Sequence, residues 1–309
     1  MTISRPLRWL TLGALLFSGT AFAQTKVVLG YTSVPDFAAA FIAKERGFFD
    51  KHKLDVTLKQ LPLTSNVPPA LVSDSIQIGG TTPPVFLQAV DSGLDLVAVA
   101  TGSTYDNTKG YVSIVGKAGS NIKSAQDLVG KKFGVPGLNG TLHVLVRRWL
   151  ADNGVDAKKV SFIEVPLPQI HGVLQGGSID AAVTAEPFVA RIVQTKVGEI
   201  VPGFSSAMPN GFATVTYVAT RQWATSNGAA VKAFRDAIAD AVAFANSHRD
   251  EAYADLGKYF KVPEPVLKAT PWPQLVANVS DAHMRFWSET MTAQDMLKKP
   301  VVLSSLLAK

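Results

Sequence analysis

The sequence predicts an α/β fold made of two similar lobes, and three observations support this prediction. Short runs rich in β-branched residues alternate with segments of helical periodicity. The resulting β-α-β pattern recurs at an offset of about 104 residues. Hydrophobic residues make up 47% of the 309 residues and charged residues 17%, which excludes a disordered chain and suffices for two folded lobes.

The first lobe is predicted from elements that alternate regularly along the chain. Strands are expected at 26–30, 55–61, 76–79 and 96–101, and helices at 37–45, 68–74 and 83–91. Short strands joined by helices imply a mostly parallel sheet that is covered by helices on both faces.

Two windows carry the internal repeat. The first aligns Leu71-x3-Ser75-Ile76-x4-Thr81-x2-Pro84 with Leu174-x3-Ser178-Ile179-x4-Thr184-x2-Pro187. The second aligns Gly30 and Leu61-Pro62 with Gly134 and Val165-Pro166. Chance likeness between two β-α-β segments is the alternative, but two similar α/β units are predicted in either case.

The pattern changes after Gly211. A strand is expected at 213–220, and the remaining chain is almost entirely helical, with a long amphipathic stretch at 229–246. We expect the chain to enter the second lobe near 106–110 and to return near 212–217, so that the two crossing segments form a hinge. The predicted division is 24–107 for the first part of lobe one, 108–214 for lobe two, and 215–309 for the return to lobe one and the C-terminal helices.

Residues 1–23 have the features of an export signal. Arg5 and Arg8 precede a short apolar stretch, and Ala21-Phe22-Ala23 forms a small-x-small cleavage site. We expect cleavage after Ala23, with an uncleaved anchor as the alternative. The chain has no cysteine, which excludes disulfides, thiolate metal sites and lipid attachment through cysteine. A periplasm is therefore the expected location.

Charge and motifs argue against nucleic-acid binding and catalysis. The net charge of +6 is small, and the basic pairs are scattered along the chain. The sequence lacks the common hydrolase, zinc-protease, P-loop and dinucleotide motifs. A metal pair of His143 and His171 is conceivable, but solvated or capping histidines are favoured. We therefore expect no enzyme activity, no metal and no other cofactor.

Four turns are candidates for a ligand site, because ligands of open α/β sheets bind beyond the carboxyl ends of the strands. Each turn ends a predicted strand and opens a helix, and they lie at 30–36, 79–84, 134–141 and 184–187. If the lobes face each other, these helix N-termini converge and suit a small oxyanion. The alternative is that Thr81, Thr82 and Thr141 are ordinary N-caps.

Acidic and aromatic residues near these turns leave two questions open. Asp36 and Glu186 lie in first helical turns, where each either caps its helix or faces the ligand. A carboxylate that faces the ligand would suit an ammonium or amidine group. Aromatic residues near the turns either form walls around an organic ligand or pack in the core; they are Tyr31, Phe37, Tyr105, Phe212 and Tyr217.

Several segments resemble the bacterial ABC-transporter substrate-binding proteins of the nitrate, sulfonate and taurine type, a family that includes pyrimidine-precursor binders. The segments are G-Y-T-S-V-P-D-F at 30–37, A-K-E-R-G-F-F at 43–49, S-A-Q-D-L-V-G-K-K-F-G-V-P at 124–136 and L-Q-G-G-S-I-D-A-A-V-T-A-E-P-F at 174–188. Together they span most of residues 24–220. The resemblance implies the two-lobed periplasmic-binding-protein fold of type II, with a small-molecule ligand and a membrane permease as partners. It implies a monomeric receptor that performs no chemistry.

The resemblance also implies a set of ligand contacts. They are Tyr31, Thr32, Val34 and Pro35 after the first strand, Thr81 and Thr82, Asn139, Gly140 and Thr141, and Thr184 and Glu186; Tyr217 is added as a possible wall. The expected ligand is a small organic anion such as a sulfonate or taurine. A neutral or amine-bearing heterocycle such as a pyrimidine precursor, or a role in sensing for a membrane signalling partner, is the alternative. The family's frequent aromatic-acid-Pro sequence is Ala185-Glu186-Pro187 here, so the ligand stays open.

Overall fold

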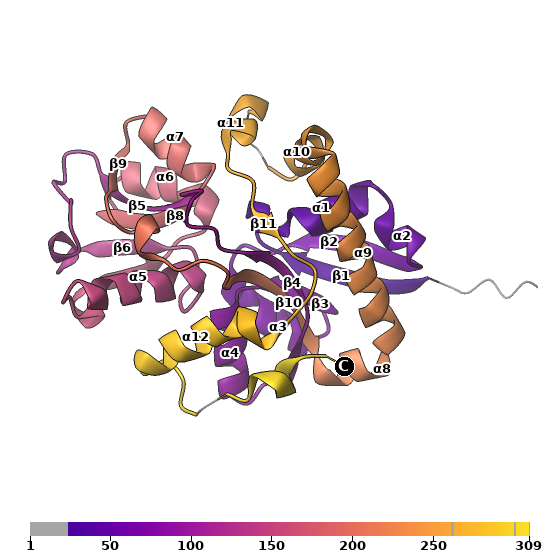
Figure 1. The fold of residues 1–309 in the computed structure, drawn as a ribbon. Coiled ribbons are helices and arrows are strands. Elements are labelled where there is room, and N and C mark those ends of the chain that lie inside the picture. The colour runs from indigo at the N-terminus through magenta and orange to yellow at the C-terminus, as the bar shows by residue number, and fades with distance from the viewer. Residues whose placement is uncertain (1–23, 261–262, 300, 309) are drawn as a thin grey trace, which may run out of the picture.

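The computed structural model describes residues 24–260, 263–299 and 301–308 and shows two lobes side by side, each built on one β-sheet (Figure 1). The predicted export signal and its cleavage site at Ala23 lie outside the described residues. We call the part around the six-stranded sheet the first lobe and the part around the five-stranded sheet the second lobe.

The first lobe contains a mixed sheet with the strand order β11-β4-β10-β3-β1-β2. Strands β1, β2 and β3 run parallel, whereas β10 is antiparallel to its neighbours β3 and β4. The strands are β1 (Thr25–Tyr31), β2 (Leu54–Gln60), β3 (Ile78–Thr81), β4 (Leu96–Thr104), β10 (Ala213–Thr220) and β11 (Gln274–Leu275). Strand β10 has the predicted bounds, and β4 extends three residues beyond its prediction.

The second lobe repeats this plan with the order β7-β6-β8-β5-β9. Strands β6, β7 and β8 are parallel, and β5 is antiparallel to β8 and β9. The strands are β5 (Val112–Lys117), β6 (Lys132–Val135), β7 (Ser161–Glu164), β8 (Ala181–Ala185) and β9 (Gly198–Val201). Both sheets are therefore mixed. In each sheet the three parallel strands lie side by side in the same order, β2-β1-β3 in the first lobe and β7-β6-β8 in the second.

The internal repeat is confirmed by matching contacts in the two sheets. A Cβ atom on Gly30 would lie 2.7 Å from Ile76 Cδ1, and one on Gly134 would lie 2.8 Å from Ile179 Cδ1. Both glycines therefore allow the same close approach of an isoleucine. The amide of Leu61 donates to Tyr31 O at 2.7 Å, and the amide of Val165 donates to Val135 O at 2.8 Å.

Helices cover both faces of each sheet (Figure 1). Helices α1 and α9 share one core of the first lobe, while α4, α5 and α12 share a second core that continues into the second lobe. The helices are α1 (Ala38–Glu45), α2 (Phe48–Lys51), α3 (Val67–Val72), α4 (Pro83–Asp91), α5 (Thr141–Asp152), α6 (Leu167–Gln175), α7 (Phe188–Gln194), α8 (Arg221–Ser226), α9 (Gly228–Ser247), α10 (Arg249–Gly257), α11 (Glu264–Ala269) and α12 (Asp281–Ala293). No helix in the described part of the chain is long and apolar enough to cross a bilayer.

Two segments cross between the lobes, after β4 and before β10. They are joined by backbone hydrogen bonds from Tyr105 N to Phe212 O and from Gly211 N to Tyr105 O, each of 2.9 Å. The rings of Tyr105 and Phe212 stack with centroids 5.0 Å apart. The return segment leads directly into β10, which begins at Ala213.

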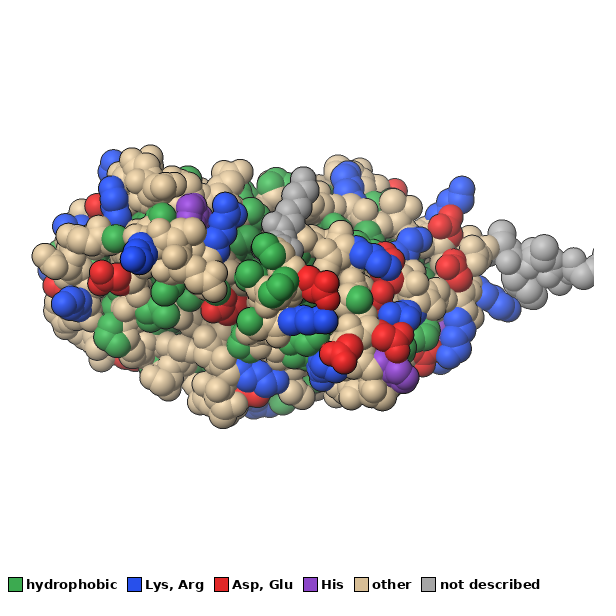
Figure 2. Space-filling view, turned by 90° about the horizontal axis from the view of Figure 1, so that it is seen from above, with side chains coloured by type: hydrophobic (Ala, Val, Ile, Leu, Met, Phe, Trp, Pro, Cys, Tyr) green, Lys and Arg blue, Asp and Glu red, His purple; other side chains and the backbone are tan. Residues whose placement is uncertain are grey.

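Helix α12 packs against both lobes beside this crossing. Trp287 is fully buried, and its Nε1 donates to Ala213 O at 2.7 Å at the start of β10. Farther along, Gln294 Nε2 donates to Val144 O on α5 of the second lobe at 3.3 Å. The C-terminal helices therefore complete the first lobe and also contact the second. Figure 2 shows basic and acidic side chains interspersed on the face that it presents.

Candidate ligand-binding site

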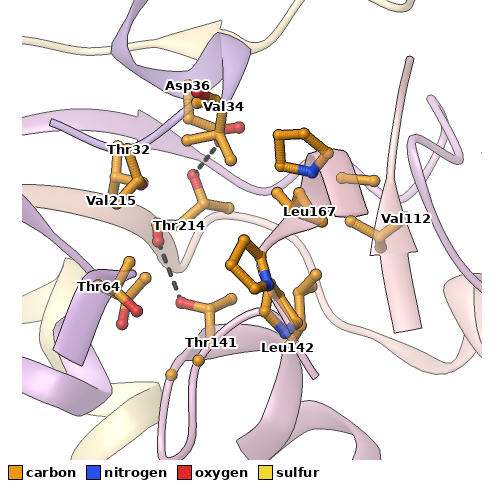
Figure 3. Close-up of a pocket in the computed structure, with 18 of the residues that line it drawn as sticks. Thr32, Val34, Asp36, Thr64, Val112, Thr141, Leu142, Leu167, Thr214 and Val215 are labelled. Atoms are coloured by element: carbon orange, nitrogen blue, oxygen red, sulfur yellow. Dashed lines mark hydrogen bonds between the residues drawn. The ribbon is translucent and has the colours of Figure 1, made fainter. Parts of the chain in front are cut away.

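A cavity of about 250 Å³ lies between the two lobes and is lined by residues of both. Each of the four predicted turns contributes to its wall: Thr32, Ser33, Val34 and Asp36 after β1; Thr82 after β3; Pro136, Gly137, Gly140 and Thr141 after β6; and Ala185 at the end of β8. The close-up in Figure 3 shows several of these side chains around one space. Three of the four predicted helix starts therefore meet at this cavity, whereas the fourth turn contributes only Ala185, the last residue of β8.

Of the residues predicted to contact a ligand, five line this cavity: Thr32, Val34, Thr82, Gly140 and Thr141. Seven others do not belong to the lining: Tyr31, Pro35, Thr81, Asn139, Thr184, Glu186 and Tyr217. That any of the twelve binds a ligand stays a prediction.

Strand geometry explains why several predicted residues miss the cavity. Thr81 and Thr184 are repeat equivalents that end or nearly end their strands; both are fully buried, and neither hydroxyl has a hydrogen-bond partner among the described residues. Tyr217 points into the core of the first lobe, where its ring contacts Phe37 and Phe234. Burial raises the pKa of the Tyr217 hydroxyl. The wall predicted at Tyr217 therefore belongs to the core.

Asp36 and Glu186, whose roles the sequence left open, lie at different positions relative to the cavity. Asp36 lies in the 3-10 helix Pro35–Phe37, is 6% exposed and lines the cavity. Glu186 lies outside the lining, and its Oε2 accepts a hydrogen bond from Ala190 N at 3.0 Å in the first turn of α7. Glu186 therefore caps α7. Burial raises the pKa of both carboxyls.

The helix starts at the cavity offer donors, but in unequal numbers. Thr82 is the N-cap of α4, yet its hydroxyl makes no capping bond and has no partner among the described residues. Prolines at 83 and 84 leave the first turn of α4 with few N–H groups. Helix α5 begins at Thr141 without proline, and Thr141 Oγ1 donates to Thr214 O at 3.1 Å. Gly140, Thr141 and Leu142 at this helix start line the cavity, and amides of a first helical turn have no intrahelical acceptor.

Sequence reasoning missed the turns that follow the second strand of each lobe. Gln60, Pro62 and Thr64 line the cavity after β2, and Pro166 to Gln169 line it after β7. The aligned Leu61-Pro62 and Val165-Pro166 pairs carried this signal, because a repeat-equivalent turn in each lobe faces the same crevice. Among the suggested aromatic walls, only Tyr105 belongs to the lining.

Residues next to the crossing segments also line the cavity, although no sequence motif indicated them. Tyr111 and Thr214 both line the cavity, and the Tyr111 hydroxyl, like that of Thr82, has no hydrogen-bond partner among the described residues. Burial, together with the nearby Asp36, raises the pKa of Tyr111 well above its ordinary value. A buried hydroxyl without a hydrogen-bond partner lowers the stability of the folded state unless a bound molecule or a water forms a hydrogen bond with it.

The lobes also touch each other beside the cavity. Glu164 Oε1 in the second lobe accepts from Ser65 Oγ of the first lobe at 3.0 Å and from Leu138 N at 2.8 Å. A Cβ atom on Gly137 would lie only 2.5 Å from Thr64 Oγ1. A side chain at position 137 would therefore require the Thr64 hydroxyl or the loop that carries residue 137 to shift.

The two histidines considered for a metal pair lie on different helices. His143 is buried on α5, where its Nδ1 accepts from Asn139 N at 2.8 Å. His171 lies inside α6, not in a turn as predicted, and its Nε2 is 2.8 Å from Thr195 Oγ1. Within the described ranges, no three His, Cys, Asp or Glu side chains are grouped as a metal site.

Comparison with known proteins assigns the chain to a family. The family model described as NMT1/THI5 like matches residues 34–252. The chain belongs to the NMT1/THI5-like family. Related family sequences include a putative thiamine biosynthesis protein of Haemophilus influenzae, 32% identical over 55% of this chain and 53% of that protein. A putative aliphatic sulfonates-binding protein of Escherichia coli is 27% identical over 73% of this chain and 69% of that protein.

Solved structures show the same fold. The alkanesulfonate-binding protein SsuA from Xanthomonas axonopodis pv. citri, bound to MOPS, superposes with a TM-score of 0.78 at 18% identity, over 93% of this chain and 99% of SsuA. The predicted periplasmic-binding-protein fold is thereby confirmed. The chain spans about half the length, or less, of several curated relatives that it matches.

Proposed function

We propose that this NMT1/THI5-like protein is the solute-binding component of an ABC importer. It captures a small organic anion of the sulfonate type between its two lobes and delivers it to a membrane permease. The observation that carries the proposal is the convergence of equivalent turns from both lobes on one cavity. A ligand that touches both lobes favours the closed arrangement by its differential affinity.

Two further observations support an acidic organic ligand. The first turn of α5 lies in the cavity wall, and the N–H groups of helix N-termini favour negative charge. Leu142, Leu167 and the prolines of the lining supply apolar surface for a carbon skeleton. The relatives named as sulfonate-binding proteins agree with this ligand class.

The remaining parts of the proposal concern place, partners and chemistry. We place the protein in the periplasm as a monomer, after cleavage of the export signal behind Ala23. Several relatives are named as binding proteins, which supports a receptor without catalytic activity, although one relative is named for thiamine biosynthesis. The lobe boundaries 24–107, 108–214 and 215–309 stay part of the proposal.

Thermal unfolding against a ligand panel tests the function. The purified protein is first stripped of carried-over ligand by unfolding and refolding. Sulfonates, sulfate, nitrate, carboxylates, aminopyrimidines and amino acids are then added at saturating concentrations. A ligand at a hundred times its dissociation constant adds about 2.7 kcal/mol, which corresponds to a shift of several degrees. A saturable shift with sulfonates supports the proposal, a shift with another class alone corrects the ligand, and no shift with any class contradicts it.

Replacing Thr82 and Thr141 together by alanine should weaken ligand binding by about 1 to 3 kcal/mol, because each hydroxyl lies at a helix start in the cavity wall. Isothermal calorimetry with the sulfonate identified in the panel measures this loss. Thr81→Ala is the control, since Thr81 is buried and, like Thr82, has an unpaired hydroxyl among the described residues, but it lies outside the lining. Unchanged affinity in the double variant would remove both threonines from the site.

A further inference from the structure

Among the described residues, Asp36 is the single acidic side chain in the cavity wall, and its surroundings are unusual for a carboxylate. Its Oδ1 accepts hydrogen bonds from Ser103 Oγ on β4 at 2.7 Å and from Thr214 Oγ1 on β10 at 2.6 Å. Figure 3 shows Asp36 beside Thr214 at the cavity. Three segments that are far apart in the chain thus hold this carboxyl at the place where a ligand would lie.

No cation accompanies this carboxyl. The lining contains no Lys, Arg or His among the described residues, and Asp36 takes part in none of their ion pairs. By contrast, the buried Asp255 lies 2.6 Å from Arg46 Nε. A buried carboxylate is costly unless a positive group compensates it, and two hydroxyl donors compensate only in part.

The same cavity holds donors that suit an acidic group. They are the first turn of α5 and two further lining residues, Thr82 and Tyr111, whose hydroxyls are buried without a hydrogen-bond partner among the described residues. The cavity therefore combines sites of opposite preference: N–H and O–H donors for a negative group, and a carboxylate for a positive one.

We infer that Asp36 determines the specificity of this site by binding a positively charged nitrogen of the ligand. Resting on the proposed function, the inference narrows the ligand to an organic anion that also carries an ammonium or protonated ring nitrogen, such as an amino-sulfonate. The nitrogen donates to the Asp36 carboxylate and supplies the counter-charge that the protein lacks there. A sulfonate without nitrogen would leave the carboxylate buried beside a second negative group.

Matched ligand pairs test the inference by calorimetry. Each pair consists of an ammonium sulfonate and the analogue in which a methyl or methylene group replaces the nitrogen: taurine with propane sulfonate, and a cyclohexylamino-alkanesulfonate with its all-carbon counterpart. The wild-type protein should bind the ammonium member of at least one pair at least tenfold more tightly. In Asp36→Asn this preference should fall to less than threefold, because the amide has no negative charge.

Ser103→Ala is the control, since it removes one hydroxyl donor to Asp36 but keeps the carboxylate; the preference should persist. The wild-type comparison decides the inference even if Asp36→Asn does not fold. Equal binding of both members of each pair overturns the inference but leaves the proposed function standing. Equal binding is the result expected if Asp36 is protonated and donates to the sulfonate. A preference that persists in folded Asp36→Asn also overturns it. Binding of no sulfonate at all contradicts the proposed function instead.

Discussion

Replacing Gly137 by alanine is expected to weaken ligand binding roughly tenfold to a hundredfold while leaving the free energy of unfolding nearly unchanged. The new Cβ would lie 2.5 Å from Thr64 Oγ1 of the first lobe, so either the Thr64 side chain or the loop after β6 would have to shift. Such overpacking typically costs about 1 to 3 kcal/mol. We expect this cost to fall on the arrangement in which the lobes touch, whereas lobes that open without ligand avoid it, so unfolding is little affected. Gly137 does not have a positive φ, so alanine suits its backbone. Calorimetry and urea unfolding measure the two quantities.

A compensating substitution separates this clash from other effects of the alanine. Thr64→Ala removes the hydroxyl, and the nearest remaining atom of residue 64 is Cβ, 3.8 Å from the new methyl group. The double variant should therefore recover most of the lost affinity. Two results would show that the contact between this loop and the first lobe does not control ligand affinity. One is an affinity of Gly137→Ala equal to that of the wild type, and the other is a double variant that binds no more tightly than Gly137→Ala.

Acid should destabilise the protein through His143, and His143→Gln should remove this part of the pH dependence. Burial, with a smaller effect from the nearby Arg147, lowers the pKa of His143 to about 4. In the unfolded chain the pKa is about 6.5. Between these pH values the unfolded state binds more protons than the folded state. The contribution of His143 to the free energy of unfolding is therefore fully present above pH 6.5 and is lost as the pH falls toward 4, by about 3 kcal/mol in total.

Local geometry supports the same direction. Nδ1 of His143 accepts the Asn139 amide, so a proton added there would face another donor. Urea unfolding of the wild type and His143→Gln at pH 7.5 and 5 gives the difference between them. His248→Gln, at an exposed position, is the control and should lose stability with pH as the wild type does. An equal pH dependence in the wild type and His143→Gln would show that His143 does not contribute.

The turns after the second strand of each lobe were not predicted to line the cavity, although the sequence carried a signal for them. Leu61-Pro62 and Val165-Pro166 aligned in the repeat, and both prolines line the cavity. The four helix-opening turns were found because Gly, Pro and Thr mark them locally. The turns after β2 and β7 open with less distinctive residues, so their approach to the cavity became visible only in the folded chain.

The sequence by itself determined the α/β class, the repeat and the turns that meet between the lobes, because hydrophobic periodicity and turn residues act over a few positions. Tertiary structure alone decided which side chains face the cavity. Asp36 acquires its role from Ser103 and Thr214, 67 and 178 residues away, whereas Tyr217 is drawn into the core between Phe37 and Phe234. Strand pairing across such separations sets the direction of each side chain, and local sequence does not encode that pairing.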